Sequence, residues 1–250
     1  MKIVPLNVAD SKKPKIESLP ETFQLAKGWR RSVIKLVEFG LRRYYCITIS
    51  PDFNRLNSEI LALDEQTKRP YVIISNHQNF WDVPLIILAV SAWIDWVCKN
   101  ELFDVPLFGN FLRKWAAIPF NRHKLDLTAI KTIIKRLKDK RIVGIFPQGH
   151  RCKTKEELLV YQPQSTIVNL IRKTHARVLL IGIAGEFKFH SKLELQMLPA
   201  FDLADFYDTD QSDDEIAYDL MRKVYTLAKK DYPTYDEMKQ FKERHNEHTK

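Results

Sequence analysis

Apolar runs typical of buried strands recur through the middle of the chain and alternate with segments of helical periodicity. The runs are Tyr71–Ser75, Ile94–Cys98, Ile142–Phe146 and Val178–Ile183. The helical patterns between them lie at about Val83–Trp93, Leu125–Lys140 and Pro163–Thr174. Strands that alternate with helices predict an α/β fold with a mostly parallel central sheet flanked by helices. In such sheets the chemistry lies just beyond the carboxyl ends of the strands, so a site is expected among the residues that follow each run.

A basic amphipathic pattern precedes the alternating region. Between Glu21 and about Tyr45, apolar residues recur at helical spacing and Lys and Arg fill the other faces. This pattern predicts an amphipathic helix, which Gly40 could break. Such a helix either caps the core or lies in the interface of an anionic membrane, with its Trp and Tyr at headgroup level.

These patterns divide the chain into two parts. Residues 1–46 form a basic arm, rich in Pro and Lys, followed by the amphipathic helix, and we interpret them as a membrane-docking segment. Residues 47–250 form the α/β domain, with an acidic, charged tail from about residue 200 and a helix-like piece at about Glu215–Lys230.

The charge distribution favours an anionic partner. The chain of 250 residues has 40 Lys and Arg against 31 Asp and Glu, a net charge of +9, and its excess of basic residues lies before residue 200. Such a basic body suits nucleic acid, an acidic membrane surface or a phosphorylated small molecule. Composition alone does not choose among these three.

Targeting signals and disulfides are not indicated. No uncharged stretch approaches the roughly 18 apolar residues of a membrane span, and the N-terminus has no apolar core of a signal peptide. Cys46, Cys98 and Cys152 match no disulfide or metal-binding spacing, which indicates free thiols in a reducing compartment. We therefore expect a cytoplasmic protein without a transmembrane helix.

The loop after the first strand carries a His and an Asp five residues apart, His77 and Asp82. At a junction of strand and helix, the carboxylate can fold back onto one imidazole nitrogen, which fixes the tautomer and leaves the other nitrogen as a general base. The alternative is an Asp that caps the helix and a His that only packs. The pair alone does not decide between them.

Basic and turn residues follow the other strands. Lys99 ends the second run, Arg122 follows a short apolar segment, and Gln148, Gly149 and Arg151 follow the third run. Guanidinium groups beside Gly or Pro turns at strand ends suit the recognition of phosphate. Each arginine alone could be an ordinary solvated residue, but their convergence on one edge of the sheet favours a site.

Together these blocks resemble the glycerolipid acyltransferases, typified by the lysophosphatidic acid acyltransferases. Their order and spacing agree across roughly residues 71–185. The family has Glu and Thr where this chain has Gln148 and His150. The matching blocks are Asn-His-x-x-x-x-Asp at Asn76, His77 and Asp82, Lys-x-Glu-Leu at Lys99–Leu102, Pro119–Arg122, and Phe-Pro-x-Gly-x-Arg at Phe146–Arg151.

The resemblance implies a glycerol-phosphate acyltransferase-like fold and a reaction. His77, oriented by Asp82, would deprotonate the free hydroxyl of lysophosphatidate, which attacks the thioester of acyl-CoA or acyl carrier protein to give phosphatidate. The thioester is already activated, so neither a cofactor nor a metal is expected. The resemblance also implies the residues that bind substrate: Asn76, Lys99, Arg122, Gln148, Gly149 and Arg151.

Several alternatives stay open. Gln148 and His150 could be tolerated variants, or they could mark a different lysophospholipid acceptor. A non-catalytic lipid-binding relative and a nucleic-acid-binding protein are two further hypotheses, although no known nucleic-acid-binding module is present and we expect no nucleic acid partner. An acyl-cysteine mechanism through Cys98 or Cys152 lacks a dedicated base. We expect a peripheral enzyme on the cytoplasmic side of a membrane, whose lipid surface is anionic.

Overall fold

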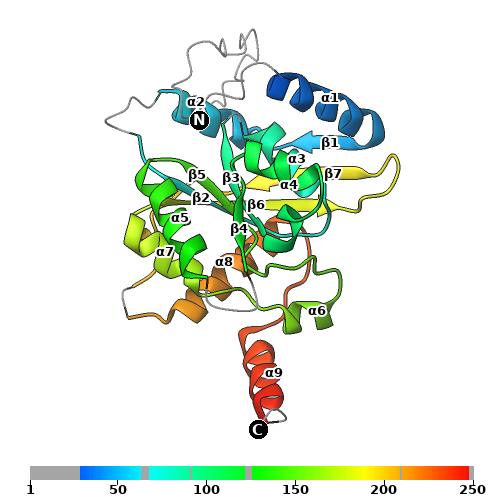
Figure 1. The fold of residues 1–250 in the computed structure, drawn as a ribbon. Helices are drawn as coiled ribbons and strands as arrows, with labels where there is room; N and C mark the ends of the chain where they lie inside the picture. The colour runs from blue at the N-terminus through cyan, green and yellow to red at the C-terminus, as the bar shows by residue number, and fades with distance from the viewer. Residues whose placement is uncertain (1–28, 63–67, 91, 122–125, 209, 248–250) are drawn as a thin grey trace, which may run out of the picture.

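The structure is a computed structural model that describes residues 29–62, 68–90, 92–121, 126–208 and 210–247. In this part of the chain seven strands form one sheet in the order β1-β7-β6-β2-β5-β3-β4 (Figure 1). The strands are β1 (Cys46–Ile49), β2 (Tyr71–Ser75), β3 (Ile94–Lys99), β4 (Ile118–Phe120), β5 (Ile142–Ile145), β6 (Arg177–Gly185) and β7 (Lys192–Met197).

Helices cover both faces of the sheet (Figure 1). They are α1 (Trp29–Tyr44), α2 (Asp52–Ala62), α3 (Asp82–Ala89), α4 (Phe108–Lys114), α5 (Leu127–Lys138), α6 (Lys155–Val160), α7 (Thr166–Thr174), α8 (Asp213–Leu227) and α9 (Tyr235–Glu247). In the described residues, the short 3-10 turns η2 (Asn100–Phe103) and η3 (Leu203–Asp205) join some of these elements.

The sheet is mostly parallel. Strand β2 lies at its centre and pairs in parallel with β5 and β6, while β3 pairs in parallel with β5 and β4. Among the strand pairs of the described residues, only β6 and β7 run antiparallel. The carboxyl ends of β2, β3, β4, β5 and β6 therefore meet at one edge of the sheet, which we call the carboxyl edge. The predicted fold class is confirmed.

Two hydrophobic cores lie on opposite faces of the sheet, and strand β2 contributes to both. Tyr71 and Ile73 pack in the core formed with α1, α2 and α3, whereas Val72 and Ile74 pack in the core formed with α5, α7 and α8. Successive side chains of a strand point to opposite faces, so a strand buried on both faces has a continuous apolar sequence. This explains why β2 contains no polar residue before Ser75.

The predicted strands and helices are found with shifted ends, but several elements were missed. Helix α1 is continuous through Gly40, which corrects the suggested break: a side chain there would meet nothing within 4 Å, so only the weak helix propensity of glycine opposes the helix. The four predicted strands correspond to β2, β3, β5 and β6. The missed elements are β1, α2, α4, β4, α6, β7 and α9.

The acidic segment after residue 200 is part of the body of the fold. Helix α8 begins at three acidic residues, and Ser212 caps its first turn by accepting a hydrogen bond from the backbone N–H of Glu215. Its inner face buries Leu220, Met221 and Val224 against β2 and β6. Helix α9 follows and extends away from the body (Figure 1). None of the helices that the structure describes is long and apolar enough to cross a membrane.

Candidate active site

The loop between β2 and α3 holds His77 and Asp82 in contact at the carboxyl edge. Asp82 is fully buried, and its Oδ2 lies 2.8 Å from His77 Nδ1. The same oxygen accepts hydrogen bonds from the backbone N–H groups of Gln78, at 2.7 Å, and Asn79, at 2.8 Å. The carboxylate thus ties the loop together and contacts the imidazole. The bonds of Asp82 go to residues that precede α3, and Trp81, at the N-cap of this helix, makes no side-chain cap bond.

The contact fixes the useful tautomer of His77. An ionised carboxylate only accepts hydrogen bonds, so Nδ1 carries the proton and donates it toward Asp82. The Nε2 atom of the neutral ring then has a free lone pair. Because the His77 side chain is partly exposed, Nε2 can reach a bound hydroxyl. This geometry is the one that a general base requires.

Two amide side chains anchor the loop to β6. Asn76 is buried, donates from Nδ2 to the carbonyl of Ile183 and accepts from its N–H, at 3.0 and 2.9 Å. Gln78 donates from Nε2 to the same carbonyl at 3.1 Å. The family pattern predicts that Asn76 binds substrate. In the structure, both polar atoms of its side-chain amide, Nδ2 and Oδ1, hold the loop against β6.

The loop after β5 turns sharply at Gly149. Its φ of +61° lies in the left-handed region that favours glycine, and its N–H donates to the carbonyl of Phe146 at 2.8 Å. That N–H is therefore engaged within the turn instead of facing the carboxyl edge. Arg151, two residues later, is exposed.

Gln148 points inward toward α8. It is only 6% exposed, and its Oε1 accepts a hydrogen bond from the hydroxyl of Tyr225 at 3.0 Å. Its Nε2 has no hydrogen-bond partner among the described residues. His150 stacks on Tyr161, with ring centroids 3.8 Å apart and planes 3° from parallel. The two departures from the family pattern thus each have an aromatic partner: Tyr225 for Gln148 and Tyr161 for His150.

The ends of β3 and β4 bring further charge to the carboxyl edge. Lys99 pairs with Phe120 in the strand register, and its ammonium forms an ion pair with Glu101 at 3.3 Å; both side chains are largely accessible. Arg122 follows β4 by two residues but lies outside the described residues. The structure therefore places Lys99 at the carboxyl edge and Arg151 in the loop that follows β5, and does not describe Arg122.

Lys230, just beyond α8, is a charged residue near the site that the motif search did not identify. Its Nζ donates to Oε1 of Gln78. Burial lowers the pKa of Lys230, and the charges of Asp82 and Glu186 oppose that effect. No local pattern could indicate this contact, because 152 residues separate its partners.

Cys152, which follows the turn at Gly149, is unsuited to nucleophilic chemistry. Cys152 is buried, and burial, with the charge of Glu157 as a smaller cause, raises the pKa of its thiol to about 12. A thiolate is the reactive form, so at neutral pH this side chain is an inert thiol. Among the described residues, no group of three or more His, Cys, Asp and Glu side chains gathers in a way that could hold a metal ion.

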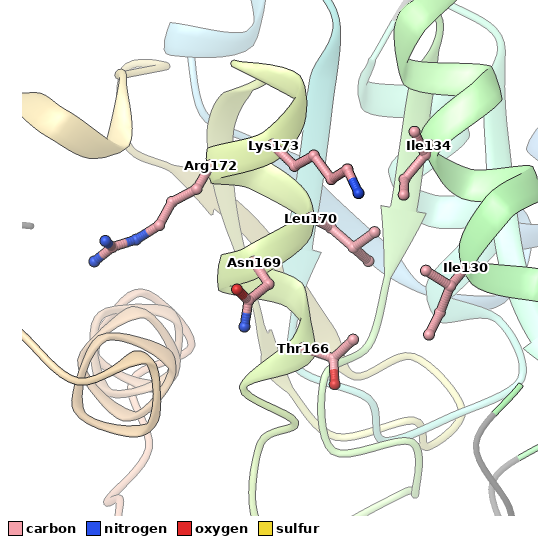
Figure 2. A pocket seen from close by; sticks show the side chains of 7 residues that line it. All are labelled: Ile130, Ile134, Thr166, Asn169, Leu170, Arg172 and Lys173. Carbon is pink, nitrogen blue, oxygen red and sulfur yellow. The ribbon is translucent and has the colours of Figure 1, made fainter. Parts of the chain in front are cut away.

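A groove elsewhere on the molecule does not include these residues. It lies between α5 and α7 and has a volume of about 480 Å³. Figure 2 shows Ile130 and Ile134 of α5 facing Leu170 and Lys173 of α7, while Arg172 points away from them. The groove includes neither His77 nor Asp82. The candidate for acid–base chemistry is therefore this pair at the carboxyl edge.

Comparison with known proteins identifies the family. Residues 32–184, more than half of the chain, match the family model described as Acyltransferase. The chain belongs to the acyltransferase family. The matched region contains the loop of His77 and Asp82 and the turn at Gly149, which confirms the family resemblance found in the sequence.

Individual relatives are similar over part of their length. A 1-acyl-sn-glycerol-3-phosphate acyltransferase of Bacillus subtilis is 36% identical over 101 residues, 40% of this chain and 50% of the relative. One of Helicobacter pylori is 30% identical over 101 residues, 39% of this chain and 42% of the relative. The chain thus spans about half or less of the length of these curated relatives.

A solved structure shares the fold over most of the chain. The crystal structure of the 1-acyl-sn-glycerophosphate acyltransferase of Thermotoga maritima matches with a TM-score of 0.55 at 20% sequence identity. The match covers 84% of this chain and 86% of that one. At this identity the likeness concerns the fold.

Proposed function

We propose that the protein transfers a fatty acyl group from a thioester, acyl-CoA or acyl carrier protein, to the free hydroxyl of lysophosphatidate, forming phosphatidate. The observation that carries the proposal is the contact of 2.8 Å between His77 and the buried Asp82 within the region matched by the family model. The curated relatives are named for this acceptor, which supports the choice of lysophosphatidate.

The reaction needs one proton shuttle. His77 Nε2 takes the proton of the acceptor hydroxyl as its oxygen attacks the thioester carbonyl, and Asp82 stabilises the imidazolium that forms. Collapse of the tetrahedral intermediate breaks the C–S bond. The leaving thiolate then receives the proton from His77, which restores the neutral base. No acyl-enzyme forms, consistent with the inert thiol of Cys152.

The acceptor phosphate would bind to basic residues at the carboxyl edge. Lys99 and Arg151 are accessible there, and we assign them, with Arg122, to the phosphate. The backbone turn at Gly149 shapes the approach to this site. Gln148 contributes indirectly, because its side chain is engaged with Tyr225.

A second acceptor class is a lysophospholipid with a larger headgroup. The motive for this alternative is that Gln148 and His150 replace the acidic and hydroxyl residues of the family pattern. Purified protein should be assayed with CoA and carrier-protein thioesters crossed with several lysophospholipids, and products should be identified by mass spectrometry. The proposed function predicts phosphatidate from lysophosphatidate, and His77→Ala should abolish it.

Other outcomes of the same assay contradict the proposal. Equal loss of thioester with and without acceptor would indicate a thioesterase. Transfer only to a lysophospholipid with a larger headgroup would establish the second acceptor class. Binding of liposomes without transfer to any acceptor would indicate a non-catalytic relative.

We also propose that α1 docks the enzyme on an anionic membrane at the cytoplasmic side. The helix buries Leu41 in the core, where Tyr45 just after its end is also buried, yet α1 leaves Leu36 71% and Phe39 70% exposed. Exposed apolar residues on a basic helix suit the interface of an anionic bilayer. The predicted docking segment begins before residue 29, so its first part lies outside the described residues.

Two substitutions test the docking surface without disturbing the core. Leu36→Asp combined with Phe39→Asp should reduce sedimentation with anionic liposomes. Leu127→Asp changes a residue that is 56% exposed on α5 and serves as the control. Unchanged sedimentation of the double variant would show that α1 is not the docking element.

A further inference from the structure

His77 is held by a second contact besides the bond to Asp82, a stack of aromatic rings. The His77 ring lies on Phe146, with centroids 4.1 Å apart and planes 16° from parallel. Phe146 in turn stacks on Trp96, with centroids 5.0 Å apart and planes 19° from parallel. His77 lies two residues after β2, Phe146 directly follows β5, and Trp96 lies within β3; these three strands are adjacent in the sheet.

A glycine makes room for the far end of the stack. Trp96 and Gly144 are partners in the register of β3 and β5. A Cβ at Gly144 would lie 2.6–2.8 Å from atoms of the Trp96 ring, closer than such atoms approach. The indole therefore lies directly on the backbone of β5. Gly144 and Phe146 share one face of that strand, since their positions differ by two, so Trp96 reaches both.

The base of the stack is rigid. Trp96 is 4% exposed and belongs to the core formed with α1, α2 and α3. Close-packed interiors hold side chains in fixed rotamers, so Phe146 rests on a ring that cannot move aside. The support of His77 thus extends from the core to the carboxyl edge through aromatic faces.

The two contacts restrain different motions of the imidazole. A hydrogen bond at Nδ1 fixes one atom but lets the ring tilt about that contact, whereas a stacked neighbour fixes the plane of the ring. Together they determine where Nε2 points. Catalytic geometry is sensitive to this direction, because a displacement of about 1 Å costs on the order of 100-fold in rate.

We propose that Phe146, supported by Trp96 on Gly144, is a positioning residue that sets the ring plane of His77 and thereby the direction of its Nε2. The consequence for activity rests on the proposed function, whereas the stack itself can be tested without it. Of these residues, Trp96 and Gly144 lie outside the blocks that carry the family resemblance.

Activity should separate positioning from binding. Phe146→Leu keeps an apolar side chain but removes the aromatic face, and should lower kcat about 10- to 100-fold while KM for the acceptor changes less than about twofold. Phe146→Tyr keeps the face and should retain most of the activity. The matched control is Phe201→Leu, the same change at a buried Phe in the opposite core, which should leave kcat near that of the parent protein.

A spectroscopic readout tests the stack in the ligand-free protein. The ring current of Phe146 should shift the His77 ring protons upfield in the NMR spectrum, with the resonances assigned by their loss in His77→Gln. Phe146→Leu should remove most of that shift, and Gly144→Ala, which displaces Trp96, should reduce it. If Phe146→Leu fails to fold, Gly144→Ala decides the question by the same measurement.

The outcomes distinguish the two proposals. Unchanged His77 shifts and unchanged kcat in the folded variants would overturn the positioning role. Altered shifts with unchanged kcat would also overturn it, because the ring plane would then not matter for the reaction. If the parent protein transfers no acyl group, the proposed function fails, and the NMR shifts alone decide whether the stack sets the ring plane.

Discussion

Asp82→Asn offers a sharp test of the proposed mechanism because it changes charge with little change of shape. A single oxygen, Oδ2, accepts the bonds from His77 and from the N–H groups of Gln78 and Asn79. The other oxygen, Oδ1, is buried without a partner among the described residues. The amide of asparagine can place its oxygen at the Oδ2 position, so the loop keeps its acceptor and loses only the negative charge.

The expected effect on catalysis follows from Coulomb's law. With about 4 Å between the carboxylate and the centre of the imidazolium, and an effective dielectric constant of about 20, the charge stabilises the protonated His77 by about 4 kcal/mol. Loss of this stabilisation lowers kcat about 1,000-fold, since about 1.4 kcal/mol corresponds to a factor of ten. KM for the acceptor should change little because its phosphate is held by other residues.

The effect on stability should be small by comparison. Hydrogen bonds to a neutral acceptor are weaker than those to a carboxylate, so Asp82→Asn should lower the free energy of unfolding by about 1–2 kcal/mol. Asp82→Ala removes the acceptor altogether and leaves the N–H groups of Gln78 and Asn79 unsatisfied, at about 1–3 kcal/mol for each. Urea unfolding followed by tryptophan fluorescence measures both variants.

One pattern of results would refute the reasoning. Transfer can be followed as thiol release from acyl-CoA in the presence of lysophosphatidate, with His77→Ala as the inactive reference. If folded Asp82→Asn keeps activity within tenfold of the parent protein while His77→Ala has none, the carboxylate charge does not assist the base. If both Asp82 variants lose stability equally, the amide has not preserved the loop, and Oδ2 is not its essential acceptor.

Three further predictions concern binding, stability and thiol reactivity. Arg151→Ala should raise KM for lysophosphatidate about 10- to 100-fold in steady-state assays with kcat nearly unchanged, since a charge-assisted hydrogen bond contributes about 1.5–3 kcal/mol; an unchanged KM would remove this residue from the phosphate site. Asp95→Ala should lower the free energy of urea unfolding by about 3–5 kcal/mol, because the fully buried carboxylate forms two bonds, of 2.5 and 2.6 Å, with Arg141. A loss below 1 kcal/mol would contradict this. At pH 8, iodoacetamide should alkylate the exposed Cys46 and spare Cys152, whose pKa of about 12 keeps it a thiol, as peptide mass spectrometry can measure; equal labelling of both would contradict the burial argument.

The missed elements show where patterns along the chain become weak. Strand β7 alternates buried Leu193, Leu195 and Met197 with polar residues, a period of two that could have predicted it. Strand β1 has only four residues, and its partner lies far along the chain in β7. A short strand of this kind carries too little periodic signal for prediction from its own residues.

The residues at the carboxyl edge were predictable from the sequence, but the distant contacts that hold them in place were not. His77 and Asp82 are five residues apart at the end of a buried strand; this spacing left two interpretations open, and the other blocks of the family pattern favoured the contact that the structure has. The inward direction of Gln148 depends on Tyr225, which lies 77 residues away on α8. Similarly, α1 has one amphipathic pattern, and only packing decides which apolar residues enter the core and which stay exposed.

The sequence by itself determined the types of most elements and the parallel α/β class, because these depend on periodicity. Its motif blocks, through their resemblance to a known family, identified the family and the positions of His77 and Asp82. Tertiary structure alone decided the strand order, the anchoring of the loop on Ile183, the contact of Lys230 with Gln78 and the stack of His77 on Phe146 and Trp96. The physical reason is that these contacts join residues distant in the chain. They exist only once the sheet has selected which strands lie side by side.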